Sequence, residues 1–220
     1  MKRVAIAFVL FVVGAGAFVF LRPSRTPPAD FVSIKKAVEY QDASLLKKAM
    51  ALPVAEHFTQ LLSQTNPSAC GPASVANVFR SAGEVATQDE IAAHGHGCAF
   101  GVCFGGLSLE QLADAARDSH HGWKIDVLHP ADAGEFRELL MRSANDPDVR
   151  LVINFDRFPL FGTGGGHHSP IGAYLEEEDL VLVLDVNEKY QPWLVRTPRL
   201  FEAMNTFDGT SKRGLIRFTH

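Results

Sequence analysis

Cysteine, histidine and aspartate side chains at three separate points of this chain could together form a nucleophilic site. Cys70 stands in "QTNPSACGPASVANVF" (64–79), where a turn of small residues gives way to a helical run. A helix N-terminus stabilises a thiolate, because the positive end of the helix dipole lies beside the sulfur. Pro72 suits the first turn of a helix, where its missing N–H has no helical partner. The alternative is that Cys70 is a small buried hydrophobe.

Gln64 precedes the cysteine by six residues, across a turn that contains Asn66 and Pro67. Acyl transfer needs hydrogen-bond donors for the developing oxyanion, typically the N–H of the nucleophile and one side-chain amide. We therefore expect Gln64 to fold back and supply that amide. The alternative is an ordinary surface glutamine.

A general base is available in "GTGGGHHSPIGAY" (162–174), where two histidines follow three glycines at the start of a predicted strand. Asp185 ends the next predicted strand. Positions 167 and 185 are symmetric about residue 176, in the acidic turn between the strands, so they should be cross-strand neighbours. A carboxylate there fixes the tautomer of an imidazole, although Asp185 could also be only a strand-end turn residue. Because side chains alternate along a strand, His168 should face the other way, and we choose His167 as the base.

The elements that must position these residues follow a simple order, with helices first and an antiparallel sheet afterwards. Helical patterns cover 33–52, 70–82, 87–94, 108–121, 134–144 and 197–205, and strand patterns cover 123–129, 150–155, 168–175, 180–186 and 214–219. Gly83 is a plausible C-cap, and Ser108 with Gln111 has capping-box spacing. This order predicts an α+β fold, and it is also the chain order of a papain-like cysteine peptidase.

The first thirty residues have a composition of their own. Met1-Lys2-Arg3 precedes an uncharged apolar run (4–21) whose helical length of about 27 Å approaches the thickness of a bilayer's hydrocarbon core. Ala15-Gly16-Ala17 suits a signal-peptide cut, whereas the apolar continuation to Leu21 favours an uncleaved anchor. We expect a signal peptide or membrane anchor (1–21), a Pro-rich linker (22–30) and a catalytic domain (31–220). The protein should then be exported, either periplasmic or anchored facing the periplasm or the outside.

The other two cysteines lie in the segment "AAHGHGCAFGVCFGG" (92–106). In an oxidising compartment Cys98 and Cys103 can pair, which leaves Cys70 as the free thiol. The same two cysteines with His94 and His96 are soft ligands suited to zinc or copper. The disulfide, the metal site and a plain glycine-rich loop are the three alternatives.

The stretches around Cys70 and His167, joined to "KYQPWLVRTPRLFEAMNT" (189–206), resemble the catalytic domain of phytochelatin synthase, particularly its short bacterial relatives. The resemblance covers roughly 53–218 and is much weaker over 84–160. Many papain-like peptidases share the Gln-to-Cys spacing, whereas "GHHSP" combined with "LDV" and "AMNT" is more specific. The resemblance implies a papain-like fold and four site residues, with a nucleophile, a base, its orienting carboxylate and an oxyanion donor: Cys70, His167, Asp185 and Gln64.

The resemblance also implies a reaction on glutathione, γ-Glu-Cys-Gly. Cys70 attacks the carbonyl of the Cys–Gly bond, His167 protonates the departing glycine, and a γ-Glu-Cys thioester remains on the enzyme. Water then releases γ-glutamylcysteine, or a second glutathione accepts the acyl group and extends a phytochelatin. Hydrolysis requires no cofactor, and a heavy-metal ion (Cd or Zn) enters only as the metal–glutathione acceptor of the transfer branch.

Two departures from the family pattern favour hydrolysis over transfer. The family carries an arginine shortly after the catalytic aspartate, whereas this chain has Glu188 near that place. Losing a fixed cation weakens the binding of a second anionic glutathione. The sequence also ends at His220, without the cysteine-rich region of the plant enzymes. For the γ-glutamyl carboxylate, Arg80, Arg157 and Lys189 are the candidates.

Composition excludes one class of partner and leaves two rival functions. The net charge is −4 without a basic stripe, which excludes the usual footprint of a nucleic-acid binder, and 46% hydrophobic residues suit one globular domain. One rival is a bacteriocin-processing type of cysteine peptidase, which shares the "CGPA" start and the Cys–His–Asp order. The other is a non-catalytic envelope metal-binding protein that uses the segment 94–103. Expected partners are glutathione and, through an uncleaved N-terminal segment, the membrane; the oligomeric state is open.

Overall fold

The computed structural model describes residues 25–220, so the expected signal peptide or anchor lies outside the described residues. Among the residues it describes, there is no helix with the length and apolarity that crossing a bilayer requires. The described part of the Pro-rich linker has no helix or strand, and it is fixed to the domain at its first residue. Arg25 forms an ion pair with Asp156 at 2.6 Å and lies 4.1 Å above the ring of Phe158.

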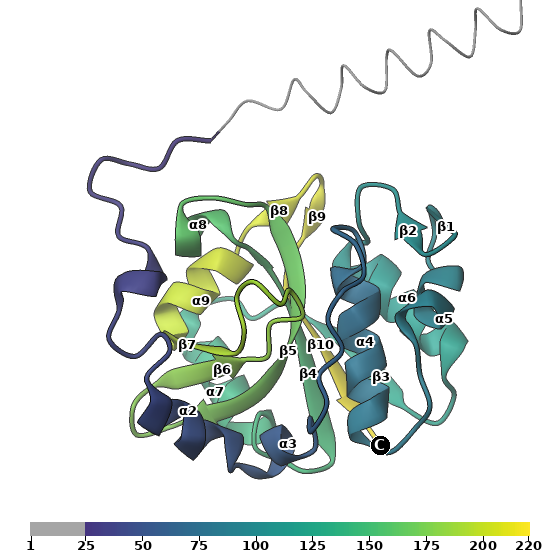
Figure 1. Ribbon diagram of the computed structural model, residues 1–220, viewed down its shortest axis with the longest axis horizontal. Coiled ribbons are helices and arrows are strands. Elements are labelled where there is room, and N and C mark those ends of the chain that lie inside the picture. The colour runs from purple at the N-terminus through teal and green to yellow at the C-terminus, as the bar shows by residue number, and fades with distance from the viewer. Residues whose placement is uncertain (1–24) are drawn as a thin grey trace, which may run out of the picture.

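A six-stranded antiparallel sheet forms the centre of the fold, in the order β3-β10-β4-β5-β6-β7 (Figure 1). Its strands are β3 (Lys124–Leu128), β4 (Val149–Asp156), β5 (Gly166–Leu175), β6 (Leu180–Val183), β7 (Trp193–Arg196) and β10 (Leu215–Thr219). Two small hairpins stand outside this sheet: β1 (Cys98–Ala99) with β2 (Val102–Cys103), and β8 (Phe207–Asp208) with β9 (Ser211–Lys212).

Helices contribute to a hydrophobic core on each face of the sheet (Figure 1). One core contains residues of α2 (Ala43–Met50), α3 (Pro53–Glu56), α4 (Cys70–Ser81), α5 (Gln88–Ala93) and α6 (Leu109–Ser119). The other contains residues of the 3₁₀ helix η1 (Ile34–Lys36), α7 (Ala133–Ser143), α8 (Phe158–Phe161) and α9 (Thr197–Met204). Strand β4 divides between them, since Val152 belongs to the first core and Leu151 and Ile153 to the second, as strand alternation requires. The α+β class predicted from the sequence is confirmed.

Local signals set several helix ends, and the sequence predicted those at Ser108 and Gly83. Ser108 caps α6 in a complete capping box with Gln111, and Thr87 caps α5 by accepting from the backbone N–H of Glu90. Gly83 follows α4 with φ 85°, a conformation that glycine adopts at little cost.

The helical pattern over 33–52 was expected to form one element, and the structure divides it. The 3₁₀ helix ends at Lys36, and α2 begins only after Asp42, whose carboxylate accepts from the N–H of Leu45. Between them Tyr40 is buried and stacks on Trp193 at 6.2 Å between ring centroids. Tyr40 and Trp193 belong to the core on one face of the sheet, whereas α2 packs into the core on the other face. One continuous helix over 33–52 could not place residues in both cores.

Candidate active site

Cys70 is the first residue of α4, as the sequence predicted. The loop before it is tied to the helix by Asn77, which exchanges hydrogen bonds with the backbone of Leu62 and also donates to the carbonyl of Ala73. The sulfur is therefore held at a helix N-terminus, where partial positive charge favours a thiolate. Cys70 is 8% exposed and lines a cavity, so it is not sealed in the core.

His167 and Asp185 are in contact, with 3.0 Å between Nε2 and Oδ1. The expected direct pairing across the hairpin is wrong in detail, because β6 ends at Val183 and a bulge shifts the register between Ile171 and Ala173. Asp185 reaches the imidazole from the loop that follows the strand. Since a carboxylate only accepts, Nε2 of His167 carries a hydrogen and Nδ1 remains to exchange protons.

Asp185 is fully buried and fully ionised by its surroundings. Nη2 of Arg157 donates to both carboxylate oxygens at 2.8 and 2.9 Å, and the indole of Trp193 donates at 3.0 Å. Burial alone would raise the pKa of Asp185, but the charges and hydrogen bonds of these neighbours and of His167 lower it to about 2. Asp185 thus remains an anion beside His167 at any physiological pH.

The Cys70 thiol and the His167 imidazole shift each other's pKa. Burial would raise the pKa of the Cys70 thiol, but hydrogen bonds and charge from His167 and His168 hold it well below its ordinary value. Burial would lower the pKa of His167, but Asp185 and the Cys70 thiolate raise it above its ordinary value. A thiolate and an imidazolium are therefore the stable pair near neutral pH.

This pair predicts the pH dependence of alkylation by iodoacetamide. Because the pKa of Cys70 is lowered, its alkylation rate should change little between pH 8 and pH 6 and fall only at lower pH. In the denatured protein the alkylation rate of the same thiol should fall about 100-fold from pH 8 to pH 6. Mass spectrometry of the Cys70 peptide measures both rates, and parallel pH curves for the two states would contradict the prediction.

His168 does not face away from the nucleophile, and that expectation is wrong. Its Nδ1 lies 4.0 Å from Sγ of Cys70, and the ring is 3% exposed. Each histidine lies against its own partner on β4: His167 packs edge-on against Phe155, whereas His168 contacts Asn154. Both imidazoles nevertheless act on one sulfur.

Gln64 is joined to the site through its backbone, and its side chain bonds a residue other than Cys70. Its backbone N–H donates to the carbonyl of Val186 at 2.8 Å, and Val186 packs against Cys70. Its side-chain Nε2 donates to the carbonyl of Asn66 at 2.8 Å, which leaves one amide hydrogen free. The oxyanion role of Gln64 stays a prediction.

Comparison with known proteins places this site in a family. The family model described as phytochelatin synthase matches residues 34–215. The chain belongs to the phytochelatin synthase family. Glutathione gamma-glutamylcysteinyltransferase 1 of Lotus japonicus is 30% identical over 222 residues, which cover 88% of this chain and 40% of that protein. Glutathione gamma-glutamylcysteinyltransferase 2 of Arabidopsis thaliana is 28% identical over 209 residues, covering 87% and 44%. This phytochelatin synthase relative therefore spans less than half the length of either protein.

The fold of this family member is that of papain-like cysteine peptidases. The peptidase domain of Streptococcus ComA, a bi-functional ABC transporter, superposes with a TM-score of 0.50 over 73% of this chain and 97% of that domain. At 15% sequence identity this likeness concerns the fold alone. The papain-like architecture predicted from the order of helices and strands is confirmed.

A cavity of about 350 Å³ opens beside the nucleophile of this phytochelatin synthase family site. Its walls come from the loop before α4, the glycines before β5 and the β8–β9 hairpin, and they include Cys70, His168, Gly166 and Asp208. A Cβ on Gly166 would come within 2.7 Å of the Arg213 guanidinium, so only glycine allows this close approach. Gly166 thus lets the Arg213 guanidinium lie close to the backbone of β5 at the cavity wall.

Arg213 is a charged residue at this wall that the sequence did not reveal. It is 5% exposed and donates to Asp208 at 3.1 Å. The three cations expected to meet substrate do not line this cavity: Arg157 is held by Asp185, Arg80 lines a separate cavity near the far end of α4, and Lys189 is exposed on a loop. In the sequence, only the three glycines before His167 indicated that a side chain, here Arg213, packs closely against β5.

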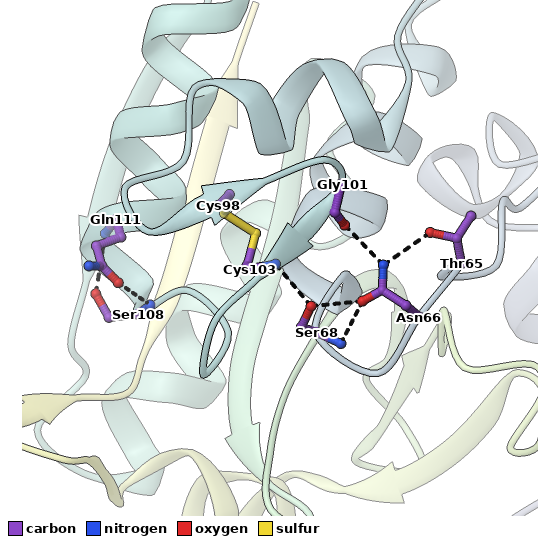
Figure 2. Close-up of a disulfide and its surroundings, with 8 residues drawn as sticks. All are labelled: Thr65, Asn66, Ser68, Cys98, Gly101, Cys103, Ser108 and Gln111. Carbon is purple, nitrogen blue, oxygen red and sulfur yellow. Dashed lines mark hydrogen bonds between the residues drawn. A yellow bond between two sulfur atoms is a disulfide. The ribbon is translucent and has the colours of Figure 1, made fainter. Parts of the chain in front are cut away.

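Cys98 and Cys103 form a disulfide (Figure 2). The predicted metal site from His94, His96, Cys98 and Cys103 is therefore not assembled, because disulfide sulfurs are not thiolate ligands. Across residues 25–220 no three histidine, cysteine or acidic side chains gather closely enough to hold a metal ion. The disulfide alternative for this segment is confirmed.

The disulfide loop braces the segment that leads to the nucleophile. In Figure 2, Asn66 donates to the carbonyl of Gly101 at 2.9 Å, and the N–H of Cys103 donates to Oγ of Ser68 at 3.0 Å. Ser68 in turn donates to Oδ1 of Asn66. The loop therefore fixes both the approach to Cys70 and the cavity wall that follows it at Gly105 to Leu107.

Removal of the disulfide should weaken stability and ligand binding together. In the variant with Cys98→Ser and Cys103→Ser, we expect the free energy of unfolding to fall by about 2 kcal/mol. Without the short cross-link, the unfolded chain gains conformational entropy. The Michaelis constant for substrate should rise several-fold while the pH dependence of Cys70 alkylation stays unchanged. Chemical denaturation and alkylation measure the two effects. Dithiothreitol should reproduce them in wild type and leave the variant unaffected; a wild type insensitive to dithiothreitol would contradict the prediction.

Proposed function

We propose that the protein is a thiol-dependent acyl enzyme that cleaves the Cys–Gly bond of glutathione and releases glycine and γ-glutamylcysteine. The observation that carries this proposal is the Cys70 thiol at a helix N-terminus, joined through His167 to the buried carboxylate of Asp185. Membership of the phytochelatin synthase family supports glutathione as the substrate. The named relatives are glutathione gamma-glutamylcysteinyltransferases.

The chemistry follows from the charges of the pair. The thiolate of Cys70 adds to the carbonyl carbon of the cysteinyl residue, and the oxyanion is met by the N–H groups at the start of α4 and by the free amide hydrogen of Gln64. His167 gives its Nδ1 proton to the glycine nitrogen as the C–N bond breaks. A thioester on Cys70 remains, and His167 then takes a proton from water as the water attacks it.

Asp208 in the cavity wall provides a carboxylate for the γ-glutamyl end of glutathione. Asp208 lines the cavity within bonding distance of Arg213, and a carboxylate there suits the ammonium of the γ-glutamyl group. A volume of about 350 Å³ is in the range of small-molecule pockets.

Transfer of the acyl group to a second glutathione is the minor branch of the proposal. The cation beside Asp185 is Arg157, which is buried and donates through Nη2 to both oxygens of that carboxylate, while Glu188 on the following loop is exposed. An anionic acceptor gains little from either group. A Cd or Zn complex of glutathione would be the acceptor substrate of this branch.

The test is incubation of the protein with glutathione, followed by mass spectrometry of the products. We expect γ-glutamylcysteine and glycine in equal amounts, with phytochelatin dimer only as a small fraction that rises when Cd is added. A peptide with a double-glycine sequence, offered as a substrate for the rival bacteriocin-processing type of peptidase, serves as the competing substrate. Cleavage of such a peptide with glutathione left intact would overturn the proposal.

We also propose that the protein works in an oxidising compartment, as an exported or membrane-anchored enzyme. The Cys98–Cys103 disulfide supports this, because such bonds persist outside the reducing cytosol. Fractionation of expressing cells, with alkylation before lysis to count free thiols, tests it. One free thiol per chain is expected, and three would contradict the proposal.

A further inference from the structure

His168 has no part in the proposed mechanism, although it lies against the nucleophile and is almost completely buried. Its two ring nitrogens face different partners. Nδ1 faces Sγ of Cys70, and Nε2 faces the side-chain amide of Asn154. Which nitrogen carries the hydrogen decides whether His168 donates to the sulfur or accepts from it.

Asn154 settles that question, because its own orientation is fixed from behind. Nη1 of Arg213 donates to Oδ1 of Asn154 at 2.6 Å. A guanidinium group can only donate, so the oxygen of the amide must face Arg213 and the nitrogen must face His168. Nδ2 of Asn154 also only donates, and Nε2 of His168 must therefore offer a lone pair. The hydrogen of the neutral imidazole is left on Nδ1, directed at the Cys70 sulfur.

We propose that His168 is a second catalytic histidine, a neutral hydrogen-bond donor to the Cys70 thiolate that Asn154 and Arg213 hold in the Nδ1–H tautomer. The two histidines then divide the work. His167 is paired with Asp185 and moves protons, whereas His168 keeps its proton and stabilises negative charge on sulfur. That charge is present before attack and returns when the thioester breaks, so the same bond serves both halves of the reaction.

The arrangement also prevents competition between the two rings. Protonation of His168 on Nε2 would direct that hydrogen at the amide hydrogens of Asn154, where no acceptor is available. The charged groups around the sulfur are few. They stand on β5, in the loop after β6, after β4 and around the β8–β9 hairpin: His167, His168, Asp185, Arg157, Asp208 and Arg213.

The inference deepens the proposed function, because it concerns the same nucleophile, but its test does not need glutathione. The variant His168→Phe keeps the size of the ring and removes the donor, and His168→Gln keeps an amide donor. We expect iodoacetamide to alkylate Cys70 about tenfold more slowly at pH 6 in His168→Phe, as expected for loss of a hydrogen bond to a charged group. His168→Gln should recover at least part of the rate.

Alkylation above pH 10 is the internal control for these variants. There the thiol is ionised in every protein, so both variants should match wild type if the fold and access to the sulfur are intact. A His168→Phe protein with the wild-type rate at pH 6 would overturn the inference. So would a loss of equal size at all pH values, which indicates structural damage in place of a lost donor.

The tautomer itself can be read in the wild-type protein, which keeps the inference testable if a variant fails to fold. In ¹⁵N NMR spectra of the imidazoles at neutral pH, we expect His168 to carry hydrogen on Nδ1 and a lone pair on Nε2. In Asn154→Asp a hydrogen should appear on Nε2, because a carboxylate only accepts. A hydrogen on Nε2 of His168 in wild type, or none on Nε2 in Asn154→Asp, would overturn it. Failure of glutathione cleavage leaves these readings unaffected.

Discussion

Cys70→Ala is expected to reduce glycine release from glutathione by at least about 10⁴-fold, the effect of removing the nucleophile from a covalent mechanism. Cys70→Ser should lose nearly as much. A serine hydroxyl is not ionised near neutral pH, whereas His167 and His168 hold the pKa of the Cys70 thiol well below its ordinary value and so stabilise a thiolate. Steady-state release of glycine measures the loss, and intact-protein mass spectrometry should detect an acyl-enzyme in wild type and none in Cys70→Ala.

Both Cys70 variants should fold, because the sulfur contributes little to the core. Within residues 25–220, its hydrophobic cluster contains Ala73 and Val186 alone, and the helix start is held by Asn77 and the preceding loop. Thermal melts close to wild type, with glutathione still bound in calorimetry, separate lost chemistry from lost structure. Glycine release within tenfold of wild type would show that the reaction does not pass through Cys70.

Asp185→Asn is expected to lower kcat/KM by about 10²- to 10⁴-fold and to change the shape of the pH profile. The carboxylate raises the pKa of His167 and, through the imidazolium, lowers the pKa of Cys70. Without its charge, the alkaline limb, where His167 loses its proton, should move to lower pH, and the acid limb, where the thiolate forms, should move to higher pH. The pH range over which the enzyme is active therefore narrows from both sides. Initial rates measured from pH 4 to pH 10 give the two limits of that range.

A control for this variant is available in the same hairpin. Asp179 stands in the turn between β5 and β6 and pairs with Arg137 through two hydrogen bonds at 3.0 and 2.9 Å. Asp179→Asn should cost some stability and leave the pH limits unchanged. Asp185→Asn also leaves Arg157 buried without an anion, so its unfolding free energy must be measured beside the rates. An unshifted profile in a folded Asp185→Asn protein would contradict the role of Asp185.

Local sequence determined the parts of the site that neighbouring residues can fix. The start of α4 at Cys70 follows from the turn before it and from Pro72 in its first turn, and the capping box fixes α6 through Ser108 and Gln111. The contact between His167 and Asp185 was also predictable, because one short hairpin joins them. In each case the chain between the interacting residues is short, so few alternative arrangements compete.

Only the tertiary structure decided which groups meet across the sheet. Asn154, His168 and Arg213 come from β4, from β5 and from the residues before β10, and they lie together because the strand order is β10-β4-β5. The sequence carries no signal for that order. Alternation along the strand predicted that His168 faces away from the nucleophile, which is wrong, because α4 brings the Cys70 sulfur to 4.0 Å from its Nδ1.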